Sequence, residues 1–225
     1  MVATLEVVVR SEQDAINADS GGADRLILIG DYSGEGRSAE PMKLARLREV
    51  TDLPIRPLVR LREGYRTDGG EVTRLKGLIA HYLELGAEGI VIGFLNGYSQ
   101  PDEEVLHALV DDERGLRFTF DRAIDRCLDY QSAWNVLDEF DGCDRVITAG
   151  SMRNLDAGLD ELIALSTQGH RPTIVAADAE ATHVVWLKRA GITNCQLSYQ
   201  VRPTRHFDCD VDAQLVRTWR ILAQG

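Results

Sequence analysis

Residues 116–149 read LRFTFDRAIDRCLDYQSAWNVLDEFDGCDRVITA and contain one complete strand, helix and strand unit. The runs 116–121 and 145–149 are short and rich in β-branched or apolar residues, which is typical of buried strands. Between them, residues 131–140 place apolar side chains at helical spacing, and Gly142 follows where a helix commonly ends. The stretch therefore predicts two parallel strands joined by a helical crossover.

The same alternation extends outward to both ends of the chain. Further strands are expected at residues 5–9, 25–29, 55–60, 89–95, 173–177 and 194–199. Further helices are expected at residues 12–19, 41–51, 71–85, 102–110, 155–167, 182–190 and 210–223. Eight strand and helix pairs in 225 residues favour a single closed (β/α)8 barrel of the TIM type over residues 1–225, with an open doubly wound sheet as the alternative.

The composition is that of an ordinary globular protein with an acidic balance. Lys and Arg number 25 against 36 Asp and Glu, a net charge of −11, and 44% of the residues are hydrophobic. No basic stripe points to nucleic acid or an anionic membrane surface as a partner, and no apolar stretch approaches the ~20 residues that span a bilayer. Four cysteines without a C-x-x-C pair, and no signal peptide, predict reduced thiols and a cytoplasmic location.

Long connections follow the predicted strands, whereas the connections from helix to strand are short. The long ones cover residues 30–40, 61–70, 122–130 and 200–209. In a (β/α)8 barrel, the loops after the strands lie at the C-terminal face, where the functional sites of such barrels are built. We therefore expect the functional site among these loops.

Charged side chains interrupt the predicted strands or end them near this face. Arg60, Arg62 and Arg122 would offer planar donors to the carboxylate or phosphate of a small anionic metabolite, with Thr148 beside them. Burying such a charge costs several kcal/mol unless it is paired, so the acids and bases are expected to meet one another. The pattern predicts an arginine clamp for an anion.

Three carboxylates are the candidate acid–base groups, Glu6, Asp121 and Asp125. For Glu6 the alternative is a buried ion network that only stabilises the barrel. For Asp121 and Asp125 the alternatives are an Arg122 bridge between them or a divalent-ion site. Asp178 is open to two readings, a helix cap or a site residue. An enzyme and a binding or scaffold protein without catalysis both fit this pattern.

The segment 118–127, FTFDRAIDRC, resembles the copper homeostasis protein CutC family, and the resemblance extends over most of the chain. Residues 5–7, 22–25, 56–62 and 145–150 share it. The resemblance implies a cytosolic (β/α)8 barrel that forms a homodimer or higher homo-oligomer. It also implies a role in copper homeostasis, with copper as a cofactor and Cys127 as its metal ligand.

Several positions depart from the pattern of that family. Ile27 stands where the family usually has glutamate, and Asp121 and Gln196 stand where it has histidines. Residues 177–179 replace a glycine-rich turn, and the cysteines of the first two strands are absent. Cu(I) prefers thiolate, thioether and imidazole ligands, so Cys127 is the soft candidate that remains near the predicted face. The arginines are all retained, and they favour an anionic ligand.

Overall fold

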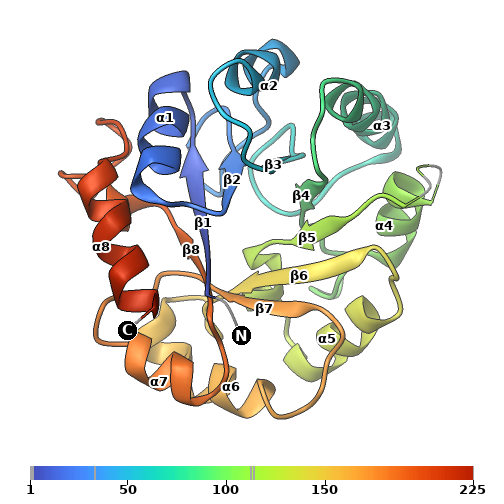
Figure 1. Cartoon of the computed structure of the whole chain (residues 1–225). Coiled ribbons are helices and arrows are strands. Elements are labelled where there is room, and N and C mark those ends of the chain that lie inside the picture. Colours follow the sequence, from blue (N-terminus) through green and yellow to red (C-terminus); the bar gives the residue numbers. More distant parts are fainter. Residues whose placement is uncertain (1–2, 33, 112, 114, 225) are drawn as a thin grey trace.

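In the computed structural model, which describes residues 3–32, 34–111, 113 and 115–224, eight short parallel strands form the centre and eight α-helices follow one another around them (Figure 1). The strands are β1 (Thr4–Val9), β2 (Arg25–Leu28), β3 (Ile55–Pro57), β4 (Ile90–Ile92), β5 (Phe118–Phe120), β6 (Cys143–Thr148), β7 (Thr173–Ala176) and β8 (Asn194–Leu197). The helices are α1 (Glu12–Gly21), α2 (Pro41–Arg48), α3 (Gly69–Glu84), α4 (Glu103–Val110), α5 (Tyr130–Asp138), α6 (Leu155–Leu165), α7 (Val184–Arg189) and α8 (Ala213–Gln224). The predicted alternation is confirmed.

The strands close into a barrel with one sparsely paired seam. Neighbouring strands pair in the order β3-β2-β1-β8-β7-β6-β5-β4. Across the seam between β3 and β4, the bridge Leu58–Val91 joins the two ends of the sheet, and the Val59 amide donates to the Val91 carbonyl at 2.9 Å. The structure is therefore the predicted (β/α)8 barrel and not the open doubly wound sheet.

Strand β3 is shorter than predicted. The strand expected over residues 55–60 ends at Pro57. Beyond it, Arg60 pairs with the loop that follows β2: its amide donates to Ser38 Oγ at 2.7 Å, and its carbonyl accepts from the Ser38 amide at 2.8 Å. The backbone at Arg60 therefore belongs to the loop layer of the C-terminal face.

The predicted loop over residues 122–130 begins with a short 3-10 helix, η1 (Arg122–Arg126). Asp121 caps this helix by accepting a hydrogen bond from the Ala123 amide at 2.9 Å. A side-chain acceptor at this position satisfies an amide that has no partner within the helix. The cap fixes the direction of the chain as it leaves β5, and it places three charged side chains of η1 at the C-terminal face.

Side-chain caps also fix where other helices begin. Ser11 accepts from the Asp14 amide at the start of α1, and Asn154 accepts from the Ala157 amide at the start of α6, both at 3.1 Å. Gly22 ends α1 with φ at +94°, a conformation that favours glycine. Among the described residues, no helix combines the length and apolar character needed to cross a bilayer.

The barrel interior is filled in layers, because alternate residues of a strand point to the same side. The layer nearer the N-terminal ends of the strands is charged and polar, and consists of Glu6, Arg25, Arg56, Thr119 and Arg145, all buried except Arg145, which is partly exposed. The next layer is apolar and buried, and consists of Val8, Ile27, Leu58, Val91 and Ile147. The apolar layer therefore separates the charged lower barrel from its C-terminal face.

Glu6 belongs to the charged layer and is fully buried. Its Oε1 atom lies 3.1 Å from Nη1 of Arg25 and 3.1 Å from Nη1 of Arg145. Two guanidiniums thus compensate one carboxylate in the barrel interior. The structure places Glu6 below the apolar layer and away from the C-terminal face, which favours its alternative, a stabilising ion network, over the predicted acid–base role.

Arg56 extends this network to two carboxylates near the N-terminal ends of β4 and β6. Its Nε atom lies 2.6 Å from Glu88 Oε2, and its Nη1 atom lies 2.6 Å from Asp144 Oδ1. Burial alone raises the pKa of Glu88, but hydrogen bonds and charges from Arg56 and Arg25 outweigh it and lower that pKa to about 2. Glu88 therefore remains ionised, and the network closes the lower end of the barrel with paired charges.

Candidate functional site

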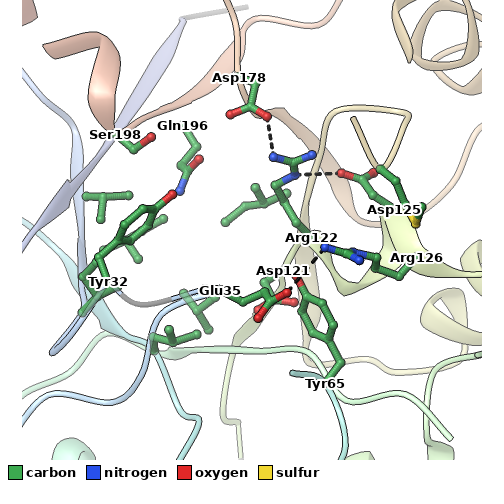
Figure 2. A pocket seen from close by; sticks show the side chains of 18 residues that line it. Tyr32, Glu35, Tyr65, Asp121, Arg122, Asp125, Arg126, Asp178, Gln196 and Ser198 are labelled. Atoms are coloured by element: carbon green, nitrogen blue, oxygen red, sulfur yellow. Dashed lines mark hydrogen bonds and ion pairs between the residues drawn. The ribbon is translucent and has the colours of Figure 1, made fainter. Parts of the chain in front are cut away.

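A pocket of about 360 Å³ lies at the C-terminal end of the barrel (Figure 2). Its floor is the apolar layer, extended by Ile29. Its walls are mainly polar; besides Gly34 and Met152, they include Tyr32, Glu35, Tyr65, Asp121, Arg122, Asp125, Arg126, Asp178, Gln196 and Ser198. Most of these residues lie on the loops after the strands, as the loop lengths predict. The volume is at the lower end of the range for small-molecule sites, ~300–1,000 Å³.

Arg122 lies between two carboxylates on one wall of the pocket (Figure 2). Its Nε atom donates to Asp125 Oδ2 at 2.9 Å, its Nη1 atom donates to Asp178, and its Nη2 atom donates to the Ser151 carbonyl at 3.2 Å. Burial lowers the pKa of Arg122, but Asp178 and Asp125 outweigh this and raise it. The bridge predicted between Asp121 and Asp125 thus joins Asp125 to Asp178 instead.

Asp125 is held rigidly beside Arg122. Its Oδ1 atom accepts from Thr148 Oγ1 at 2.5 Å, and its Oδ2 atom accepts from the Ala149 amide at 3.0 Å. Burial raises the pKa of Asp125, against the opposing effects of Arg122 and Thr148. The Thr148 hydroxyl also lies 2.6 Å from the Tyr130 hydroxyl, and Thr148 is absent from the pocket wall. Thr148, predicted as a substrate ligand, therefore positions Asp125.

Arg60 is enclosed behind the wall and pairs with Asp121. The Arg60 side chain is 1% exposed; its Nη2 atom donates to Asp121, and its Nη1 atom donates to the Glu35 carbonyl at 2.9 Å. Its guanidinium carbon lies 4.7 Å from the centre of the Tyr65 ring. A Cβ atom built on Gly93 would lie 1.7 Å from Asp121 Oδ1, so the place of this carboxylate requires glycine there.

The predicted clamp of three arginines is not assembled. The Arg62 side chain is 48% exposed and pairs outside the pocket, with Asp68 at 2.8 Å and with Glu71 at 2.9 Å. Sequence reasoning missed Arg126, whose side chain is 47% exposed, lines the pocket and lies 3.5 Å from Glu35. The signal was its position four residues after Arg122, on the same helical segment.

The opposite wall carries uncharged polar groups (Figure 2). Tyr32 stacks on Phe207 of the loop after β8, with ring centres 3.8 Å apart. Burial and the nearby Asp178 carboxylate raise the pKa of Tyr32, which keeps its hydroxyl neutral. Gln196 and Ser198 come from β8 and the residue that follows it. Sequence reasoning noted Gln196 only as a family departure.

Asp178 follows β7 and reaches the pocket from a left-handed backbone conformation, with φ at +53°. Such a conformation favours glycine, although aspartate tolerates it better than most residues. This agrees with the resemblance, which places a glycine-rich turn at residues 177–179. Of the two readings of Asp178, the site residue is the one that the geometry supports, because it lines the pocket and pairs with Arg122.

The donor set does not fit a copper ion held by the protein. No group of three or more His, Cys, Asp or Glu side chains within the described ranges is placed to hold a metal ion. Burial, followed by the charge of Asp125, raises the pKa of Cys127 to about 12, and its Sγ atom faces the Ala123 carbonyl at 3.7 Å. Thiolate is the form that binds metals, so this neutral thiol is a poor ligand.

Comparison with known proteins gives consistent matches. A model of the CutC family matches residues 3–201. The family protein CutC of Klebsiella pneumoniae (strain 342) is 32% identical over 193 residues, which cover 85% of this chain and 78% of that protein. The family protein CutC of Xanthomonas campestris pv. campestris (strain 8004) is 33% identical over 191 residues, which cover 83% of this chain and 78% of that protein.

Two solved structures share the fold. CutC from Streptococcus agalactiae, whose name carries a proposed role in copper homeostasis, matches with a TM-score of 0.79 at 18% identity, over 87% of this chain and 98% of that chain. Phosphoribosyl anthranilate isomerase from Thermococcus kodakaraensis matches with a TM-score of 0.68 at 13% identity, over 100% of both chains. At these identities the likeness concerns the fold alone.

Proposed function

Because the chain belongs to the CutC family, we propose that it acts in the cytosol by binding a small organic anion in the pocket at the C-terminal face of the barrel. The observation that carries this proposal is the state of Arg126. Its guanidinium lies on the pocket wall and keeps about half of its surface exposed, and its one ion pair among the described residues is the 3.5 Å contact with Glu35. A ligand carboxylate or phosphate takes the place of Glu35 beside it.

The other two arginines at the pocket, Arg60 and Arg122, are already paired with carboxylates. Arg60 is committed to Asp121 and Arg122 to its two carboxylates, so these cations hold the pocket walls in place. Breaking a buried pair by removing one partner costs ~3–5 kcal/mol, so a ligand gains little by displacing them. A half-exposed pair such as Arg126 with Glu35 is worth ~0–1 kcal/mol, so exchanging its carboxylate is inexpensive.

The floor of the pocket defines the rest of the ligand. Val8, Ile27, Leu58, Val91 and Ile147 present branched apolar side chains toward the cavity. An apolar or partly apolar ligand body gains ~25 cal/mol per Å² when it covers such a surface. The ligand is therefore an amphipathic molecule, with its apolar part on the floor and its anionic group near Arg126.

Replacement of Arg126 with glutamine is expected to weaken the binding of small anions about tenfold or more, because a charge-assisted hydrogen bond contributes ~1.5–3 kcal/mol. Calorimetric titration with 4-methylpentanoate and with inorganic phosphate measures this. The matched control is Arg62→Gln, which removes an arginine of the predicted clamp that lies outside the pocket. Weaker binding by the Arg62 variant, with full binding by the Arg126 variant, would refute this proposal. It would instead support the arginine clamp predicted from the sequence.

Copper homeostasis is the second candidate function, and membership of the CutC family is the observation that favours it. Anaerobic competition for Cu(I) against a chelator of known affinity tests it, with the reduced protein beside its Cys127→Ser variant. Since the Cys127 thiol is held neutral, we expect no stoichiometric Cu(I) binding and no difference between the two proteins. Tight binding that the substitution abolishes would establish Cys127 as a copper ligand.

A further inference from the structure

We propose that Asp178 recognises a positively charged amino group, so that the ligand of the pocket is a small zwitterion of the amino-acid class. This inference rests on the proposed function, because it assigns the second charged end of the same ligand. Arg126 takes the carboxylate of that ligand, and Asp178 takes its ammonium group. Both side chains line the same cavity.

The charge balance of the pocket is the first argument. The carboxylates on its walls are Glu35, Asp121, Asp125 and Asp178. The guanidiniums that face them are Arg122 and Arg126, with Arg60 behind Asp121. Four carboxylates against three guanidiniums leave one negative charge in excess among the described residues. A ligand that brings only an anion increases this excess, whereas a zwitterion, whose ammonium group balances its own carboxylate, leaves it unchanged.

The hydrogen bonds of these carboxylates locate the excess at Asp178. The two carboxylate oxygens of Asp121 accept from Arg60 and from the Ala123 amide. Those of Asp125 accept from Thr148 and from Arg122. Glu35 contacts Arg126 through Oε1, and its Oε2 accepts from the Gly64 amide at 3.4 Å. These three carboxylates therefore have partners at both oxygens.

Asp178 differs from them. Its Oδ2 atom is held by Arg122, whereas its Oδ1 atom has no hydrogen-bond donor among the described residues. The side chain is only 16% exposed, so bulk water has limited access to the unpaired oxygen. A carboxylate fixed at one oxygen and open at the other presents a ready acceptor to a bound group.

An ammonium group suits this acceptor better than a hydroxyl or a second anion. Hydrogen bonds between charged partners are about twice as strong as those between neutral ones. An ammonium group also has three N–H donors, of which Asp178 accepts one. The uncharged Gln196 and Ser198 on the opposite wall offer oxygens that can accept from the other two. A phosphate dianion would instead add two negative charges to a wall that already carries an excess.

A matched ligand series tests this proposal. Its members are leucine, 2-hydroxy-4-methylpentanoate, 4-methylpentanoate and inorganic phosphate, and the first three share a branched body suited to the floor of Val, Ile and Leu side chains. Calorimetric titration of the wild-type protein at neutral pH gives the affinities. We expect leucine to bind about tenfold or more tightly than its hydroxy and unsubstituted analogues, because only leucine carries the ammonium group.

The matched variants are Asp178→Asn, which keeps the size and polarity of the side chain but removes its charge, and Asp160→Asn, on an exposed position of α6. The Asp178 variant should lose the preference for leucine, and the Asp160 variant should keep it. Equal binding of leucine and its two analogues by the wild type, or an unchanged preference in the Asp178 variant, would overturn the inference while leaving anion binding intact. Binding of none of the four compounds would overturn the proposed anion site together with it.

Discussion

Replacing Glu6 with alanine is expected to lower the free energy of unfolding by about 3–5 kcal/mol, because it removes a buried carboxylate that pairs with two guanidiniums in the barrel interior. Glu6 is fully buried, so bulk water does not screen its ion pairs. Equilibrium denaturation by urea measures the loss. Glu6→Gln provides a second variant of nearly unchanged volume, and we expect it to be destabilised in the same direction and by less.

The control for Glu6 is Glu12, which pairs with Arg46 at 2.7 Å but is 38% exposed. Glu12→Ala removes the same kind of side chain from a solvated pair, and such pairs contribute ~0–1 kcal/mol. A Glu6→Ala protein as stable as the wild type that has lost ligand binding would show that Glu6 serves the site. In that case the acid–base role predicted from the sequence would stand.

Replacing Gly93 with alanine is expected to cost about 3 kcal/mol of stability and to abolish ligand binding. The added Cβ atom would lie 1.7 Å from Asp121 Oδ1 and 2.9 Å from the Ala123 Cβ, so the carboxylate must move. A displaced Asp121 no longer pairs with Arg60, whose buried charge then loses its carboxylate partner among the described residues. Thermal unfolding and titration with 4-methylpentanoate measure the two effects.

Gly97 supplies the matched control for this substitution. It lies four residues further along the chain, and a Cβ atom built on it meets nothing within 4 Å. Gly97→Ala should therefore leave both stability and binding close to those of the wild type. A Gly93→Ala protein that behaves like Gly97→Ala would mean that Asp121 has room to relax, and that its present position is not required.

The fold could be predicted because its signals are local. The run 116–121 and the helix after it carry their own periodicity, and eight repeats of that pattern restrict the topology to very few choices. The errors occurred where distant segments decide the outcome. Strand β3 ends at Pro57, and Arg60 beyond it pairs with Ser38 of the loop after β2, a contact across 22 residues that no local pattern contains.

The site was predicted less completely, for the same reason. The sequence pointed to the face that holds the pocket and to most of the charged residues that line it, but it could not assign their partners. Arg122 pairs with Asp178, 56 residues away, and not with the nearby Asp121. Arg60 and Arg62 are two residues apart, yet one is enclosed behind the wall and the other pairs at the surface. These pairings depend on the paths of loops that meet only in the folded barrel.

The apolar layer between the charged interior and the pocket has a consequence for how this protein can change over time. It insulates two sets of ions from each other, so a substitution that alters the ligand-binding charges does not disturb the charges that close the barrel. Substitutions separated in this way tend to act additively. The framework and the binding specificity can therefore evolve independently, and a new ligand preference can be selected without a compensating change in the lower half of the molecule.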